Sequence, residues 1–208
     1  MEHVFAPGHV GRVSDGAEAA LPYKEMIVGI GLDSDELDQP RYLFGELLGR
    51  SWVDSFRITS HSDLNQKNTH EHIRQVAETL GGSGADRLDR GMNAALQEEI
   101  DILAARCTGM PFCPCVYIRH TAEGEVFPHT RKLFGSGIKF TIASDDPAYM
   151  EDNWLLRNLC MVRDTGQFTD RETMQLHSNA IDTCWASDMI KRELSARLDR
   201  LKRSRTSE

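Results

Sequence analysis

The chain lacks the features that mark membrane-spanning and disulfide-rich secreted proteins. None of its apolar runs approaches the roughly 20 residues that a membrane-spanning helix needs. Its five cysteines are too few and too scattered for a disulfide scaffold, which favours a reducing, cytoplasmic setting. The first residues show no basic start followed by an apolar core, so we expect no secretory signal there.

The chain also lacks an excess of positive charge. Its 24 Lys and Arg residues stand against 32 Asp and Glu residues, for a formal net charge of −8. Because phosphate binding favours a basic surface, this balance argues against nucleic acid as a partner. The most basic stretch, 192–205, alternates basic with acidic and apolar residues, which predicts a solvated helix.

What remains is the composition of an ordinary soluble globular protein. At 208 residues, the length suits a single domain of moderate size. Weak periodicity predicts a divergent or poorly ordered segment over 1–25. We expect the main domain to span 26–187, and a C-terminal helix and tail to span 188–208.

Short apolar runs alternate with segments of helical spacing along the chain. The runs predicted as strands are 26–32, 56–61, 86–91, 111–118 and 138–144. The segments predicted as helices are 40–52, 69–82, 95–107, 127–137, about 151–164, 169–180 and 188–203. Strict alternation predicts right-handed βαβ units and a parallel sheet, so the fold class is α/β.

Polar residues gather where the predicted strands end. In parallel α/β folds the functional groups lie at the carboxyl ends of the strands. Three of the five predicted ends carry groups able to bind metal or move protons, at 33–36, 61–63 and 144–146. Asp145 and Asp146 are adjacent carboxylates, and burying a charge is costly unless it is paired or coordinates a metal. This turn is therefore either solvated or a cation site.

Several motifs carry a resemblance to a known family. They are "GIGLDSDE" (29–36), "TSHSD" (59–63), "DRLDRGMNA" (86–94), "CP" (113–114), "IKFTIASDDPAYM" (138–150) and "HSNAIDTCW" (177–185). In order and spacing the chain resembles the adenosine/adenine deaminase family of metal-dependent amidohydrolases, from about Met26 to Trp185. The "GLDS.E" form of the first motif looks more like the adenine deaminases.

The resemblance implies a (β/α)₈ barrel with one zinc ion, at which water attacks C6 of a purine and ammonia leaves. Adenine would give hypoxanthine, and adenosine would give inosine. By resemblance, His61 and Asp145 are metal ligands, and Asp146 contacts the attacking water or the purine ring. Bound zinc lowers the pKa of water toward 7, and its charge allows both carboxylates to stay ionised.

Other candidate residues lie beside these motifs. Ser34 and Glu36 are candidates for binding the purine, although a solvated turn explains them equally well. The family's proton-donating Glu is replaced here by Leu64, so Asp63, one residue earlier, is the catalytic candidate. Arg90 stands where the family has a His that helps to deprotonate the water, and Arg cannot act as a base near neutral pH.

The His-x-His of the family's first strand is absent from this sequence. The chain's own His70-Glu71-His72 lies on a predicted helix, where residues two apart point about 200° apart. These histidines therefore do not converge on one metal, and we expect them to face solvent.

The five predicted units match the fourth to eighth strands of the family's barrel. A full barrel takes about 250 residues, so the expected fold is a partial TIM barrel followed by C-terminal helices. Such a barrel exposes sheet edges, and we expect residues 1–25, an oligomer or a partner to cover the open edge. Two function classes stay open. One is a zinc-dependent purine deaminase whose activity is impaired by the missing His-x-His and the two replaced catalytic residues, and the other is a catalytically inactive remnant or interaction protein.

Overall fold

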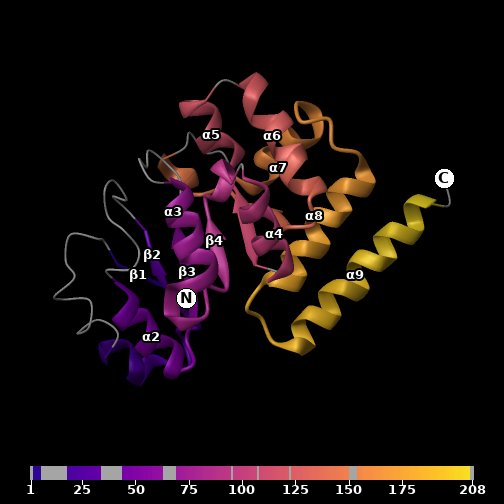
Figure 1. Cartoon of the computed structure of the whole chain (residues 1–208). Helices are drawn as coiled ribbons and strands as arrows, with labels where there is room; N and C mark the ends of the chain where they lie inside the picture. Colours follow the sequence, from indigo (N-terminus) through magenta and orange to yellow (C-terminus); the bar gives the residue numbers. More distant parts are fainter. Residues whose placement is uncertain are drawn as a thin grey trace. The chain divides into compact units, whose positions relative to one another are not determined.

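A computed structural model describes residues 2–5, 18–33, 44–62, 69–94, 96–106, 108–121, 123–149 and 154–206. The chain divides into two compact units, Met1–Met110 and Pro111–Glu208 (Figure 1). Across the described ranges, no helix is both long enough and apolar enough to cross a membrane.

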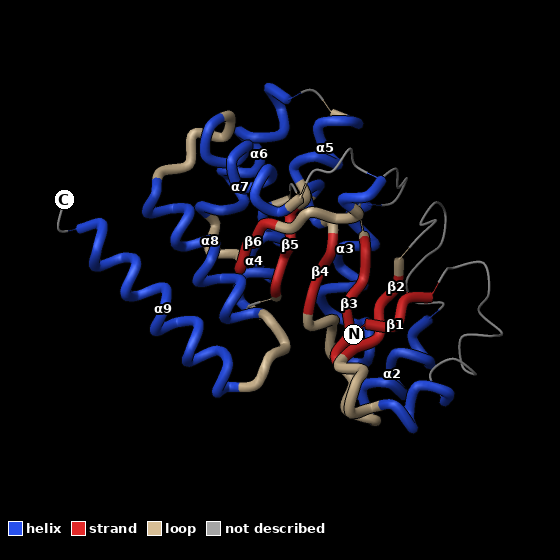
Figure 2. Tube along the Cα trace, turned by 180° about the vertical axis from the view of Figure 1, so that it is seen from behind, coloured by secondary structure: helices blue, strands red, loops and turns tan. Residues whose placement is uncertain are grey.

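The first unit is built on parallel strands (Figure 2). They lie side by side in chain order: β1 (Glu2–Phe5), β2 (Gly29–Leu32), β3 (Arg57–His61) and β4 (Arg87–Asp89). Gly109, the first residue of β5 (Gly109–Phe112), pairs with Arg87 of β4. All four residues of β2 and the centre of β3 are buried, as expected for strands covered on both faces.

Helices connect these strands in the βαβ order that the sequence predicts. They are η2 (Leu21–Tyr23), α2 (Gly45–Val53), α3 (Thr69–Arg74), the π-helix η4 (Gln75–Thr79), η5 (Leu80–Gly82), η6 (Gly91–Asn93) and α4 (Gln97–Ala105). Their inner faces and the strands form a core of fully buried side chains, among them Ile30, Leu48, Ile58, Ile73, Val76 and Leu88.

A tight turn leads from η5 into β4 and depends on glycine. Gly84 adopts φ +86°, and a Cβ placed there would lie 2.1 Å from the backbone oxygen of Ala77. The next residue, Ala85, donates its N–H to the carbonyl of Val76 at 2.7 Å. Asp86 then accepts hydrogen bonds from the backbone N–H of Ile58 at 2.8 Å and from Nη1 of Arg57 at 2.7 Å. The turn thereby places β4 beside β3.

The second unit begins inside β5 and is mostly helical. Its elements are α5 (Pro114–His120), α6 (Glu123–Gly135), β6 (Lys139–Ile142), η7 (Pro147–Tyr149), α7 (Leu155–Asp164), α8 (Asp170–Thr183) and α9 (Asp188–Thr206). The N–H of Ala143 donates to the carbonyl of Phe112 at 2.8 Å, which joins the end of β6 to the end of β5. Asn179 Nδ2 donates to the carbonyl of Phe140 at 2.8 Å and anchors α8 on β6.

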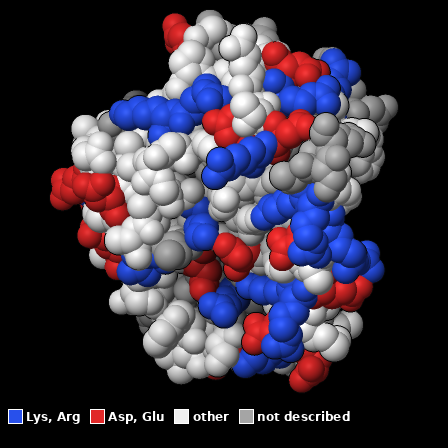
Figure 3. Space-filling view, turned by 90° about the vertical axis from the view of Figure 1, so that its right-hand side faces the viewer, with Lys and Arg blue, Asp and Glu red and all other residues white. Residues whose placement is uncertain are grey.

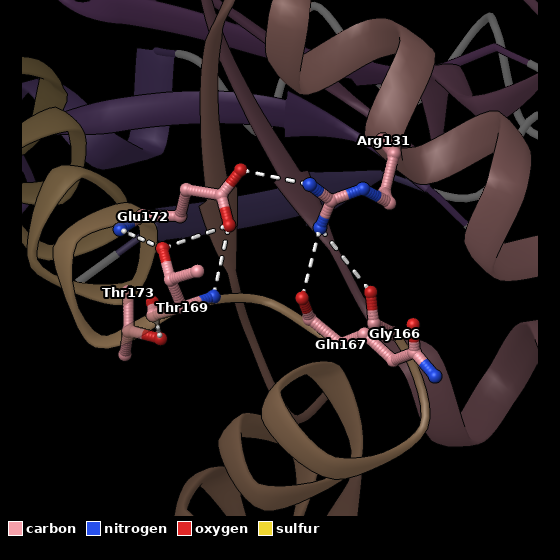
Figure 4. Close-up of polar contacts among 6 residues, drawn as sticks. All are labelled: Arg131, Gly166, Gln167, Thr169, Glu172 and Thr173. Atoms are coloured by element: carbon pink, nitrogen blue, oxygen red, sulfur yellow. Dashed lines mark hydrogen bonds and ion pairs between the residues drawn. The ribbon is translucent and has the colours of Figure 1, made fainter.

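Arg131 ties α6 to the start of α8 (Figure 4). Its guanidinium donates to the carbonyls of Gly166 and Gln167, at 3.3 Å and 3.2 Å. It also pairs with Glu172 Oε1 at 2.9 Å. Glu172 in turn forms a capping box with Thr169 at the first turn of α8. One cation therefore satisfies the loop carbonyls and the helix start together.

The last helix, α9, has the charged, solvent-exposed character that the sequence predicts. Glu193 pairs with Arg197 one turn later at 2.5 Å, and Asp199 lies 3.8 Å from Lys202. On the face drawn in Figure 3, Lys and Arg side chains are interspersed with Asp and Glu side chains.

One predicted element was wrong, and one strand had not been predicted. The stretch 111–118 is not one strand, because β5 ends at Phe112 and Pro114 opens α5. Proline is tolerated in the first helical turn, whose N–H groups have no intrahelical acceptor. The buried Val116 and Tyr117 resemble strand residues in sequence, but here they are the inner face of a helix. The short strand β1 was not predicted.

Candidate active site

His61 stands at the carboxyl end of β3, as the sequence predicts, and contacts a carboxylate. Its Nδ1 lies 2.6 Å from Oδ1 of Asp33, the residue that directly follows β2. The register pairs Leu32 with Ser60, so Asp33 and His61 occupy the next positions of adjacent strands. The separation is that of an ion pair rather than of an aligned hydrogen bond.

A second polar group lies further along the same face of β3 and β4. The register pairs Thr59 with Arg87 and His61 with Asp89. Side chains alternate along a strand, so Thr59 and His61 share a face. Asp89 accepts from Arg87 Nε at 2.9 Å and from the hydroxyl of Thr59. Sequence reasoning missed this group. The available signal was a polar residue two positions before the end of β3 and of β4, Thr59 and Arg87.

Arg90 follows β4 at the position where the family has a His. Its backbone is left-handed, with φ +58°, and it opens the short helix η6. The next residue, Gly91, is confined by packing, because a Cβ there would lie 2.5 Å from Leu88 Cδ2. The turn is thus closely fitted around Arg90, and its side chain brings a permanent cation where a proton acceptor was expected.

In the second unit, Asp145 and Asp146 form the turn that follows β6. Asp145 is left-handed at φ +58°, a conformation that Asp tolerates better than most residues. Its Oδ1 accepts the backbone N–H of Asp146 at 2.9 Å. The carbonyl of Asp146 accepts the N–H of Tyr149 at 3.0 Å, which opens η7. Asp145 is partly buried and Asp146 is exposed, so the adjacent carboxylates have different surroundings.

Three predicted site residues, Asp63, Ser34 and Glu36, lie outside the described residues, as does Leu64. His61 belongs to the first unit and Asp145 to the second. Within the ranges that the structure describes, no group of three or more His, Cys, Asp and Glu side chains is arranged to hold a metal ion.

The His70-Glu71-His72 segment is helical, as predicted, but its two histidines differ in exposure. His70 is half exposed, and its Nδ1 lies 2.7 Å from Oε1 of the fully buried Glu99. His72 is only 3% exposed, so the expectation that it faces solvent was wrong. Residues two apart on a helix point to nearly opposite sides, and His72 lies on the side that packs inward.

Comparison with known proteins places these features in a family. The family model described as adenosine deaminase matches residues 7–201. An uncharacterized deaminase of Schizosaccharomyces pombe is 36% identical over 171 residues, covering 82% of this chain and 49% of that protein. An adenine deaminase of Rhodospirillum rubrum is 31% identical over 184 residues, covering 87% and 53%. The chain spans about half the length of these curated relatives.

Solved structures share the fold. The adenine deaminase of Arthrobacter aurescens superposes with a TM-score of 0.86 at 22% identity, covering 97% of this chain and 61% of that one. An amidohydrolase of Burkholderia ambifaria with bound zinc gives 0.79 at 21% identity, covering 100% and 58%. The predicted fold class, a partial (β/α)₈ barrel, is confirmed by this likeness. With a family match from residue 7 to residue 201, the chain belongs to the adenosine deaminase family.

Proposed function

We propose that the chain acts as a metal-dependent purine deaminase, which converts adenine and water to hypoxanthine and ammonia. The observation that carries this proposal is the family match over residues 7–201, together with 31% identity to an adenine deaminase. We choose adenine over adenosine as the proposed substrate because relatives from Rhodospirillum rubrum, Aspergillus fumigatus and Psychrobacter cryohalolentis are adenine deaminases.

The proposed metal is one zinc ion. His61 and Asp145 offer an imidazole nitrogen and a carboxylate oxygen, the donor types that zinc accepts. The contact of Nδ1 with Asp33 leaves Nε2 as the metal-binding nitrogen of His61. Since the described residues provide no group of three ligands, the proposed site needs ligands in addition to His61 and Asp145. Bound zinc would supply a water of lowered pKa.

The remaining candidates take the proton and substrate roles. Adding water to C6 of adenine requires that the water lose a proton and that the ring gain one before ammonia leaves. We assign the first transfer to Asp146, whose carboxylate is exposed, because Arg90 cannot accept a proton. We assign the second transfer, protonation of the ring, to Asp63. We assign Ser34 and Glu36 to binding the edge of the purine.

A second candidate function is a deaminase-like interaction protein without catalysis. The observation that favours it is Arg90, a fixed cation at the place of a catalytic base. In the first unit β1 is an edge strand that pairs with β2, and such an edge is a surface onto which another chain can add. A second copy or another partner covering this edge is the form of association we propose.

The test is ammonia release from zinc-loaded protein supplied separately with adenine and adenosine, with products separated by chromatography. We expect hypoxanthine from adenine, and a loss of rate of about 100-fold or more in Asp146→Asn. Asp164→Asn is the matched control, because Asp164 is an exposed residue of the same unit that pairs only locally with Arg163 at 2.7 Å. Zinc-loaded wild-type protein that leaves both substrates unchanged would contradict the enzyme and support the interaction protein.

A further inference from the structure

The last helix, α9, packs on its neighbour α8 through one side (Figure 1). Lys191 Nζ donates to the Asp182 carbonyl at 2.8 Å, and Lys202 Nζ donates to the Ser178 hydroxyl at 3.2 Å. Between these two lysines, Leu198 is only 8% exposed. At about 100° per residue, the three α9 residues fall within an arc of about 40°, which is the side that faces α8.

A second line of apolar residues on α9 is left exposed. Ile190, Leu194 and Leu201 are 44%, 38% and 54% exposed. They also fall within an arc of about 40°, which is centred about 80° away from the side that faces α8. Arg197 lies at the edge of this line, so the four residues follow one another at spacings of four, three and four. That spacing is typical of the seam between two paired helices, and we call these four residues the α9 seam.

We propose that the α9 seam pairs antiparallel with the α9 seam of a second copy of this chain. Apolar side chains that are exposed together mark surfaces at which other chains bind. In an antiparallel pair, Ile190 of one copy meets Leu201 of the other, and Leu194 meets Arg197. Each contact occurs twice, as the two-fold symmetry of a dimer requires. The inference does not depend on the proposed deaminase function.

The charges beside the α9 seam favour a second copy as the partner. Glu193 and Arg200 are both exposed and lie on the flank of the seam that is turned away from α8. Antiparallel pairing brings Glu193 of each copy beside Arg200 of the other, which gives two attractive contacts. Parallel pairing would instead set Arg197 against Arg197 of the second copy, and these like charges repel. The charges are therefore complementary for two antiparallel copies.

The first test measures the mass of the protein in solution by sedimentation equilibrium over a range of concentrations. We expect a reversible monomer–dimer equilibrium in the wild type. Leu194→Glu should weaken dimerisation by about tenfold or more, because a charge replaces an apolar side chain that the dimer buries. Leu156→Glu is the matched control, since it makes the same change at a leucine of α7 that is 73% exposed, and it should dimerise like the wild type.

The second test uses the charge reversals Glu193→Arg and Arg200→Glu, first separately and then as an equimolar mixture. Each variant alone should dimerise about fivefold or more weakly than the wild type, because both contacts beside the seam then join like charges. The mixture should recover dimerisation, since one copy carries acidic side chains at both positions and the other carries basic ones. A fluorescent label on one variant identifies the mixed dimer. Parallel pairing would show no such recovery, because positions 193 and 200 do not meet in it.

Three results would overturn the inference. The first is a wild type that stays monomeric at the highest concentration reached. The second is a dimer that forms equally well in Leu194→Glu, which would place the contact elsewhere, such as at the edge strand β1. The third is a mixture of the two charge reversals that dimerises no better than either variant alone. Turnover of adenine is not part of any of these readouts, so the inference and the proposed function succeed or fail separately.

Discussion

Glu172 shows how a single side chain can join two helices. Its carboxylate accepts the backbone N–H of Thr169 at 2.8 Å and the Thr169 hydroxyl at 2.9 Å, and it pairs with Arg131 at 2.9 Å. These contacts, the backbone hydrogen bond first, hold the pKa of Glu172 below its usual range. A lowered folded-state pKa stabilises the fold above the unfolded-state value, and this contribution is lost as pH falls through the folded-state value.

We therefore predict that Glu172→Gln lowers the free energy of unfolding by about 1–3 kcal/mol at pH 7, because it removes a cap and charge-assisted hydrogen bonds. The difference from wild type should shrink below about pH 4, where the carboxylate is increasingly protonated. Urea unfolding at several pH values measures both effects. Glu193→Gln, in the exposed pair with Arg197, is the control and should change stability by at most about 1 kcal/mol. A difference independent of pH would contradict the role given to the charge.

His177, on the same helix, adds a second pH dependence. Burial lowers its pKa below the usual range, because the charged form is poorly solvated. The unfolded chain then binds the proton more readily, so stability should fall as pH drops below about 6.5. His177→Gln should flatten the stability profile between about pH 6.5 and 5, while the exposed His120→Gln should leave it unchanged. An identical slope in His177→Gln and wild type would refute this account.

At the level of helices and strands, the connection from η5 to β4 contains two glycines with very different surroundings. Gly82 and Gly84 have nearly the same φ, +89° and +86°. A Cβ at Gly82 would have nothing within 4 Å, whereas one at Gly84 would meet the Ala77 carbonyl oxygen at 2.1 Å. The two positions therefore separate conformational strain from steric conflict.

Gly82→Ala should lower the free energy of unfolding by about 1–2 kcal/mol, the strain of a left-handed alanine. Gly84→Ala should cost clearly more, because a backbone atom has to move as well. Chemical denaturation of both variants measures the difference. An equal loss of unfolding free energy in both variants would show that the backbone near Ala77 moves easily, and would contradict a close fit of Gly84 against the Ala77 carbonyl.

At the level of helices and strands, the sequence predicted some elements correctly and missed others. The run behind β2 was recognised because strands buried on both faces are continuously apolar. The run behind β3 was recognised by its β-branched and aromatic residues. The helix α5 was not recognised, because Val116 and Tyr117 favour strands and only their packing makes them helical. The contact of Asp33 with His61 was missed as well, since it depends on the register of β2 against β3.

For the whole molecule, the motifs at the strand ends predicted the partial deaminase barrel, and the structural likeness to an adenine deaminase confirms it. His61 and the Asp145-Asp146 turn lie at ends of strands, as expected. Their roles as ligands and acids remain predictions, because a metal site is defined by several side chains converging from different strands. A single sequence gives the residue types but not their convergence.

Zinc content is the measurement that tests the central claim most directly. After equilibrium dialysis against zinc and removal of free metal, the account predicts about one tightly held zinc ion per chain in the wild type. It predicts loss of that ion in both His61→Ala and Asp145→Ala, while Asp164→Asn keeps it. Zinc retained at wild-type stoichiometry and affinity in Asp145→Ala would contradict the assignment of Asp145 as a ligand, and with it the proposed active site.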